Sequence, residues 1–107
     1  MKSLKFRKTL SRLILNRTKK STWRLFDDKD ITVGDIVSFL IWESGEEFAK
    51  VRITFVKETA FGNLKKDDFE GHEKFVSDEE MYKLYSEYYR RKVDKCSIVK
   101  IIHFELI

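Results

Sequence analysis

The stretch Arg17-Thr-Lys-Lys-Ser-Thr-Trp-Arg-Leu-Phe26 joins a predicted helix to a predicted strand. Residues 7–17, which lead into it, carry apolar residues at spacings of three and four, a pattern that predicts a helix with one apolar face. Residues 21–26 contain threonine and tryptophan, which favour an extended strand. Because side chains two apart in a strand point to the same face, Thr22 and Arg24 are expected to lie side by side.

Further elements are predicted on both sides of this junction. A short strand over residues 3–6 precedes the helix, and three more strands are predicted over residues 36–42, 48–59 and 98–107, with a helical turn or two within 65–74. A second helix is expected to begin at Ser77-Asp-Glu-Glu80, in which the serine hydroxyl can accept a hydrogen bond from the Glu80 amide. Its apolar face carries Met81, Leu84, Tyr85 and Tyr88.

These elements fit one small domain over residues 1–107. The expected fold class is α+β, a small partly closed β-barrel of about five strands flanked by two or three helices. The chain is 42% hydrophobic and has nine Phe, four Tyr and two Trp, which is enough apolar surface to build a core. Intrinsic disorder of the whole chain is therefore excluded.

Cysteine content and hydropathy limit where the protein can work. A single cysteine, Cys96, excludes an internal disulfide and a cysteine-built zinc site, and it suits a reducing compartment. The longest apolar run, residues 36–42, is far too short to span a bilayer. We therefore expect a cytoplasmic protein that does not enter a membrane, with a monomer as the default state.

Charge is distributed very unevenly along the chain. The first 24 residues carry nine Lys or Arg and no acidic residue, whereas the other 83 carry 13 basic and 18 acidic residues. Such a field attracts a polyanion to one end of the chain. It favours RNA or a phosphorylated nucleotide as partner, and the alternative is a solvated basic helix that serves solubility.

Conventional catalytic and metal-binding sets are not visible in the sequence. The two histidines, His72 and His103, have neither HExxH nor paired-cysteine spacing around them, so we expect no metal and no cofactor. Cys96 precedes a predicted strand and is interpreted as a small hydrophobic residue rather than as a nucleophile. The candidate catalytic and binding residues are therefore those of the junction over residues 17–26.

Aromatic residues adjoin the basic cluster and could stack on bases. Trp23 and Tyr89 are the candidates for ligand binding, because Tyr88 falls on the apolar stripe of the second helix and is expected in the core. The alternative is that Trp23 and Phe26 pack in the core and bind nothing.

The junction resembles the ASCH family of small domains, which have a PUA-like β-barrel. The family motif is a glycine, a lysine two residues later, an acidic residue three after that and an arginine two after that. This chain has Arg17, Lys19, Thr22 and Arg24 at those positions. The resemblance continues through Val33-Gly34-Asp35, the strand over 50–54, Glu70-Gly71 before Ser77, and the closing residues 99–106.

Two departures from the motif affect what the resemblance implies. Arg17 stands in place of the glycine, so the usual backbone geometry of this turn cannot be assumed. Thr22 stands in place of the acidic residue. In one branch of the family, amidohydrolases that remove acetyl from N4-acetylcytidine, a threonine at this position is the proposed nucleophile, the lysine its activator and a distant glutamate the acid/base.

The resemblance thus implies two different functions. In the first, the protein binds RNA, a nucleoside or a nucleotide in a basic cleft lined by Arg17, Lys19, Lys20, Trp23, Arg24 and Tyr89. In the second, it is a metal-independent amidohydrolase in which Lys19 activates Thr22 and either Glu70 or Glu73 serves as the acid/base. A lysine can take the proton of a threonine hydroxyl only if its own pKa is lowered, and burial beside other cations favours that. A third possibility is a protein-interaction module whose basic helix binds an acidic partner.

Overall fold

The structure is a computed structural model that describes residues 2–26, 29–72 and 74–107. Its elements in chain order are β1 (Lys2–Phe6), α1 (Lys8–Leu15), β2 (Ser21–Leu25), β3 (Ile36–Ile41), β4 (Glu47–Ala60), the 3-10 turns η1 (Phe61–Asn63) and η2 (Lys66–Phe69), α2 (Asp78–Tyr89) and β5 (Ile98–Leu106). Each predicted helix and strand is present, with ends that move by one or two residues.

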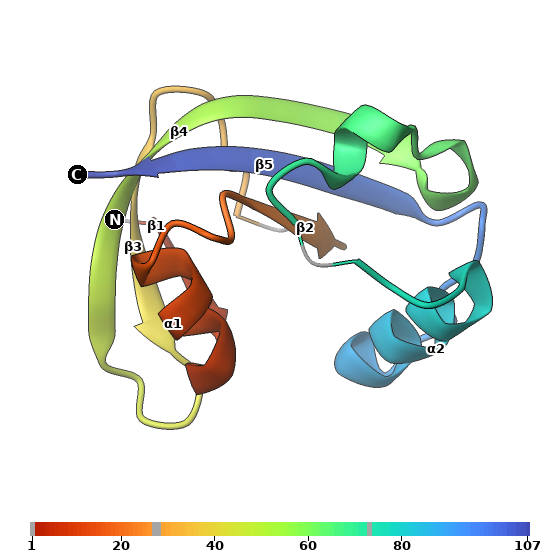
Figure 1. The fold of residues 1–107 in the computed structure, drawn as a ribbon, viewed down its shortest axis with the longest axis horizontal. Helices are drawn as coiled ribbons and strands as arrows, with labels where there is room; N and C mark the ends of the chain where they lie inside the picture. Colours follow the sequence, from red (N-terminus) through yellow and green to blue (C-terminus); the bar gives the residue numbers. More distant parts are fainter. Residues whose placement is uncertain (1, 27–28, 73) are drawn as a thin grey trace.

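The five strands form one mixed sheet in the order β1-β3-β4-β5-β2. β1 pairs with β3 in parallel, and the other neighbours are antiparallel. The long strands β4 and β5 arch over the helices, so the sheet curls into a half-barrel (Figure 1). The two edge strands are joined where Arg24 Nη2 of β2 donates to the Lys5 carbonyl oxygen of β1 at 2.8 Å. This is the expected α+β, partly closed barrel.

Apolar side chains form two clusters, one with each helix. The first contains Ile14 of α1, and the second contains Met81 and Tyr85 of α2. Strand β5 contributes to both clusters, because successive side chains of a strand point to opposite faces. Ile102 and Phe104 belong to the first cluster, and Val99 and Ile101 belong to the second.

Two details of side-chain burial differ from the sequence prediction. In the predicted strand 48–59, apolar Ala49, Val51, Ile53 and Phe55 alternate with other residues and should share one face, but a bulge between Ile53 and Phe55 breaks this alternation and leaves Phe55 44% exposed. In α2, Met81 and Tyr85 are buried, but Leu84 is only half-buried and Tyr88 is 52% exposed. The expectation of Tyr88 in the core was wrong, because the contact face of α2 is narrower than the apolar stripe in its sequence.

Candidate functional site

The loop that follows α1 holds Arg17 in a left-handed backbone conformation. Arg17 has φ 66°, its amide donates to the Ile14 carbonyl at 3.1 Å, and the Thr18 amide donates to the Leu13 carbonyl at 2.9 Å. These are the two hydrogen bonds of a Schellman motif, in which the residue in the position of Arg17 is usually glycine. The loop therefore has the geometry of a glycine turn although arginine occupies it.

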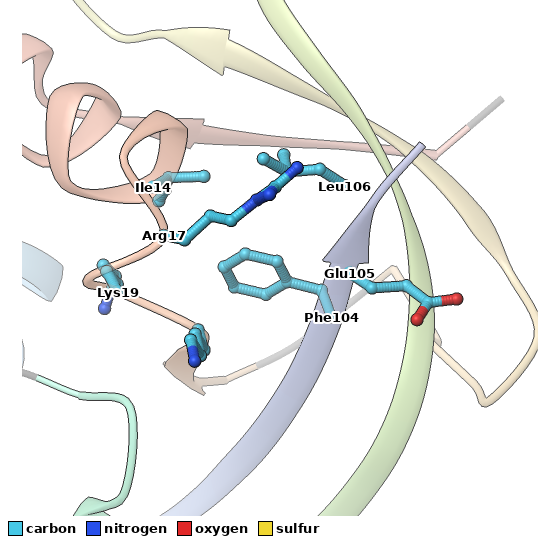
Figure 2. A pocket seen from close by; sticks show the side chains of 7 residues that line it. Ile14, Arg17, Lys19, Phe104, Glu105 and Leu106 are labelled. Atoms are coloured by element: carbon cyan, nitrogen blue, oxygen red, sulfur yellow. The ribbon is translucent and has the colours of Figure 1, made fainter.

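A pocket of about 200 Å³ opens between this loop and the end of β5. Its lining consists of Ile14, Arg17, Lys19, Lys20, Phe104, Glu105 and Leu106. Figure 2 shows the Arg17 side chain extending from the loop toward Leu106, above the ring of Phe104, while the Glu105 carboxylate points away. The pocket thus brings together three of the predicted ligand-binding cations and adds an aromatic wall that the sequence did not indicate.

Two of the predicted catalytic residues are almost fully buried at the start of β2. Lys19 is 3% exposed and Thr22 is 4% exposed, whereas Lys20 between them is exposed. The Lys19 amide donates to the Leu13 carbonyl at 2.9 Å, and Thr22 lies opposite Ile102 of β5 in the sheet. The helix end and the strand pairing therefore fix the backbone on either side of Lys20.

The loop that carries Glu70 is hydrogen-bonded to the same segment. The Gly71 carbonyl accepts from the amides of Lys20 at 2.7 Å and Ser21 at 3.1 Å, and Ser21 Oγ donates to the Glu70 carbonyl at 3.2 Å. Gly71 has φ 74°, and a Cβ there would lie 2.9 Å from Cβ of Lys20, so the close approach requires glycine. Glu70 is thereby brought next to Lys20, with an exposed side chain. Glu73 lies outside the described residues.

Arg24, which was expected to line the cleft, has its guanidinium turned toward β1. In addition to the hydrogen bond to the Lys5 carbonyl, the guanidinium carbon lies 4.7 Å from the ring centroid of Phe6. Phe6 belongs to the first apolar cluster, as Ile102 does. Thr22 and Arg24 accordingly share the inner face of the half-barrel, as the strand spacing predicted.

The two aromatic residues predicted to contact a ligand occupy the core side of β2. Trp23 is 2% exposed and its ring stacks on His72 with centroids 3.9 Å apart. Tyr89 is half-buried, and its hydroxyl accepts from the Leu25 amide at 3.1 Å. The expectation that Trp23 offers a free ring was wrong, because the ring is buried against Tyr85 of α2. Tyr89 remains a candidate, with part of its side chain exposed.

The nine cations of the N-terminal segment do not all face the pocket. Arg17, Lys19 and Lys20 line the pocket, Arg24 joins β2 to β1, and Lys2 forms an ion pair with Asp35 at 2.8 Å. The other four cations, Lys5, Arg7, Lys8 and Arg12, are exposed on β1, α1 and the link between them. Only part of the positive charge of this segment therefore lies at the pocket.

In the described part of the chain, no helix has the length and apolar character that a membrane span requires. No family model matches the sequence. No curated protein matches it either.

Comparison with solved structures finds three informative relatives. The ASCH domain from Lactobacillus crispatus JV V101 is 12% identical, with a TM-score of 0.73, over 98% of this chain and 79% of that one. Hypothetical protein PH0355 is 30% identical over 100% of both chains, with a TM-score of 0.72. Protein PF0455 from Pyrococcus furiosus is 30% identical over 99% of this chain and 96% of that one, with a TM-score of 0.66. The fold is therefore that of an ASCH domain, and the chain belongs to the same family as PH0355 and PF0455.

Proposed function

We propose that the protein binds RNA or a nucleotide, with a phosphate held in the basic pocket beside α1. The observation that carries this proposal is the convergence of Arg17, Lys19 and Lys20 on one pocket with Phe104 as a wall. Cations that meet an aromatic surface are the means by which proteins hold single-stranded nucleic acid.

The size of the pocket limits how much of a ligand it can enclose. At about 200 Å³ it is smaller than the roughly 300–1,000 Å³ of pockets that enclose a drug-sized ligand. It suits one phosphate or one base, with the rest of the ligand lying outside. This favours a nucleotide or a short single strand over a fully enclosed metabolite.

The test is the salt dependence of binding to a fluorescein-labelled dodecamer of uridylate, followed by fluorescence anisotropy. Log Kd should change linearly with log salt, and Lys20→Ala should reduce the slope by about 0.7 for each lost phosphate contact. Lys92→Ala is the matched control, because Lys92 follows α2, does not line the pocket and has a side chain that is 88% exposed. Equal slopes for wild type and Lys20→Ala would contradict the proposal.

A second candidate function is favoured by the burial of Lys19 and Thr22 beside the loop of Glu70. In this reaction the Thr22 hydroxyl attacks the acetyl carbonyl of N4-acetylcytidine and gives its proton to Lys19. A carboxylic acid, Glu70 or Glu73, protonates the departing cytidine amine, and water then hydrolyses the acetyl-threonine ester to acetate.

Acetate release from N4-acetylcytidine tests this second function without any added metal. Thr22→Ala and Lys19→Ala should each abolish turnover, while Thr22→Ser, which keeps a hydroxyl, should retain part of it. Comparison of Glu70→Gln with Glu73→Gln identifies the carboxylate. Binding of the dodecamer without acetate release would eliminate the hydrolase and leave the binding function.

A further inference from the structure

Trp42, directly after β3, is a large aromatic residue that the fold leaves 55% exposed. Its backbone is firmly held: the Trp42 amide donates to the Phe6 carbonyl at 2.8 Å, and the turn behind it is closed by the Gly45 amide on the Ile41 carbonyl at 2.7 Å. The ring is therefore presented to solvent from a hydrogen-bonded hairpin and not from a loose loop.

Two cations lie over this ring. Lys5 Nζ lies 5.5 Å from the ring centroid of Trp42, and the guanidinium carbon of Arg7 lies 5.3 Å from it. Both side chains are exposed. A single exposed aromatic residue needs no explanation. An exposed ring with two cations on it has the composition of a stacking platform for a base with charges for the adjoining phosphates. We call Lys5, Arg7 and Trp42 the Trp42 patch.

The carboxylate of the adjoining residue, Glu43, is directed away from an anion at this patch. Glu43 follows Trp42, and its two carboxylate oxygens accept from the Lys8 amide at 3.1 and 3.3 Å. The carboxylate is thus directed at the first turn of α1, where the helix dipole partly compensates its charge. The cations of the Trp42 patch remain available to phosphate.

Helix α1 connects the Trp42 patch to the basic pocket. It begins directly after Arg7 and ends at the loop of Arg17, and its eight residues span about 12 Å. Lys8 and Arg12 are exposed on it, and the chain has no acidic residue before position 27. Figure 1 shows α1 beside β1 and β3, with the β3–β4 hairpin near the end where the helix starts. The two sites are the two ends of one basic track.

We propose that Trp42 is a base-stacking residue of a second nucleic-acid contact, and that the ligand is a single strand long enough to reach from the pocket to the Trp42 patch along α1. This inference rests on the proposed function, because it takes the pocket as the first phosphate contact. It adds that a mononucleotide occupies only part of the site. A base that stacks on the Trp42 ring displaces Lys5 or Arg7 from above it. The two cations then bind the neighbouring phosphates.

The experiment measures the affinity of the full chain for uridylate dodecamer and for uridine monophosphate, together with tryptophan fluorescence. Trp42→Ala should weaken dodecamer binding by about 5- to 100-fold, as expected for one lost base stack, and Trp42→Phe should recover most of it. The affinity for uridine monophosphate should not change. Because Trp23 is 2% exposed, the dodecamer should quench the fluorescence of Trp42, and the quenching should disappear in Trp42→Phe. Phe55→Ala, which removes an exposed ring from β4, is the matched control.

The outcomes separate this inference from the function on which it rests. Dodecamer binding that depends on Lys20 but is unchanged in Trp42→Ala would overturn the second contact and keep the pocket. If Trp42→Ala lost affinity for both the dodecamer and uridine monophosphate, the second contact would be overturned as well, because the substitution would then have disturbed the fold and the pocket. Equal quenching by a poly-glutamate peptide would assign the Trp42 patch to an acidic protein partner. Absence of dodecamer binding by the wild type would refute both proposals.

Discussion

At the scale of single residues, Arg17 combines a backbone geometry that favours glycine with a side chain directed into the pocket. A left-handed conformation costs an ordinary residue roughly 1–2 kcal/mol relative to the right-handed one. Outliers of this kind persist where the surrounding structure determines them, and they gather at binding and catalytic sites. Here the Schellman hydrogen bonds determine the conformation, and Figure 2 shows the Arg17 side chain extending across the pocket toward Leu106. We interpret the strain at Arg17 as the cost of that placement.

Arg17→Gly should therefore separate stability from binding. Relief of the strain, partly offset by the greater chain entropy of unfolded glycine, should raise the free energy of unfolding by about 0.5–1 kcal/mol. Loss of the guanidinium should weaken dodecamer binding and reduce its salt slope. Urea unfolding and the anisotropy titration measure the two effects. A less stable variant with unchanged affinity would show that Arg17 serves only the turn.

At the scale of elements, the periodicity of the sequence predicted which helices and strands form, but not which of their side chains are exposed. The apolar spacing of residues 7–17 and the Ser77 cap gave α1 and α2, and Ser77 Oγ indeed accepts from the Glu80 amide at 3.2 Å. The sequence predicted that Tyr88 is buried and Tyr89 is free, whereas Tyr88 is exposed and Tyr89 is half-buried. This difference was not predictable, because it depends on the position of the Leu25 amide of β2, which donates to the Tyr89 hydroxyl. The exposure of Phe55 likewise depends on a bulge, which leaves no pattern in the sequence.

The burial within α2 gives a quantitative prediction. Met81 is 2% exposed and lies in the second apolar cluster, so Met81→Ala should lower the free energy of unfolding by about 2–5 kcal/mol. Leu84→Ala is the matched control and should cost clearly less, because Leu84 is half-buried. Chemical denaturation of both variants measures the difference. Equal losses would mean that α2 packs through a different face.

The short turn η2 is attached to the sheet through Asp68, and this attachment should depend on pH. Asp68 is 6% exposed, it accepts from the Lys65 amide at 2.8 Å and it pairs with Lys57 Nζ of β4 at 3.0 Å. Desolvation works to raise the pKa of Asp68, but the Lys65 amide and the Lys57 ammonium outweigh it and hold that pKa below its usual value. The folded state therefore holds this proton less tightly than the unfolded state.

The sign of the pH effect follows from this lowered pKa. The contribution of Asp68 to stability is complete above the unfolded pKa of about 3.9, and it is lost as pH falls through the lower folded-state pKa. At neutral pH, Asp68→Asn should cost about 1–3 kcal/mol. Its stability should also fall less than that of the wild type below about pH 4, measured by urea midpoints. Parallel pH profiles would contradict the attachment. Some acid loss will remain in the variant, because the Lys2 hydrogen bond also lowers the pKa of Asp35.

At the scale of the whole molecule, the strand order is the feature that local sequence could not supply. Neighbours in the sheet, such as β2 and β5, are separated by more than seventy residues in the chain. Their pairing is what carries Phe104 to the pocket opposite Arg17. The motif of residues 17–24 identified the basic half of the site. The apolar wall of the site, Phe104, could not be predicted without knowing that β5 pairs with β2.

The curl of the sheet also changes the expected role of Arg24. Its guanidinium joins the two edge strands, through the Lys5 carbonyl and the ring of Phe6, and thereby closes one side of the half-barrel. Hydrogen bonds that involve a charged group contribute about 1.5–3 kcal/mol, and a cation over an aromatic ring adds about 0.5–2 kcal/mol. A residue engaged in this way stabilises the fold before it contacts any ligand.

Arg24→Ala should therefore lower the free energy of unfolding by about 2–4 kcal/mol, as the sum of these two contacts allows. Amide hydrogen exchange should accelerate in β1 and β2, the two strands that lose their connection, more than in the central strand β4. Arg24→Lys should recover only part of the loss, because an ammonium lacks the planar fork that reaches the Lys5 carbonyl while stacking on Phe6. The salt slope of dodecamer binding should stay close to that of the wild type. A slope reduced by about 0.7 with unchanged stability would instead make Arg24 a phosphate contact, as the sequence motif first suggested.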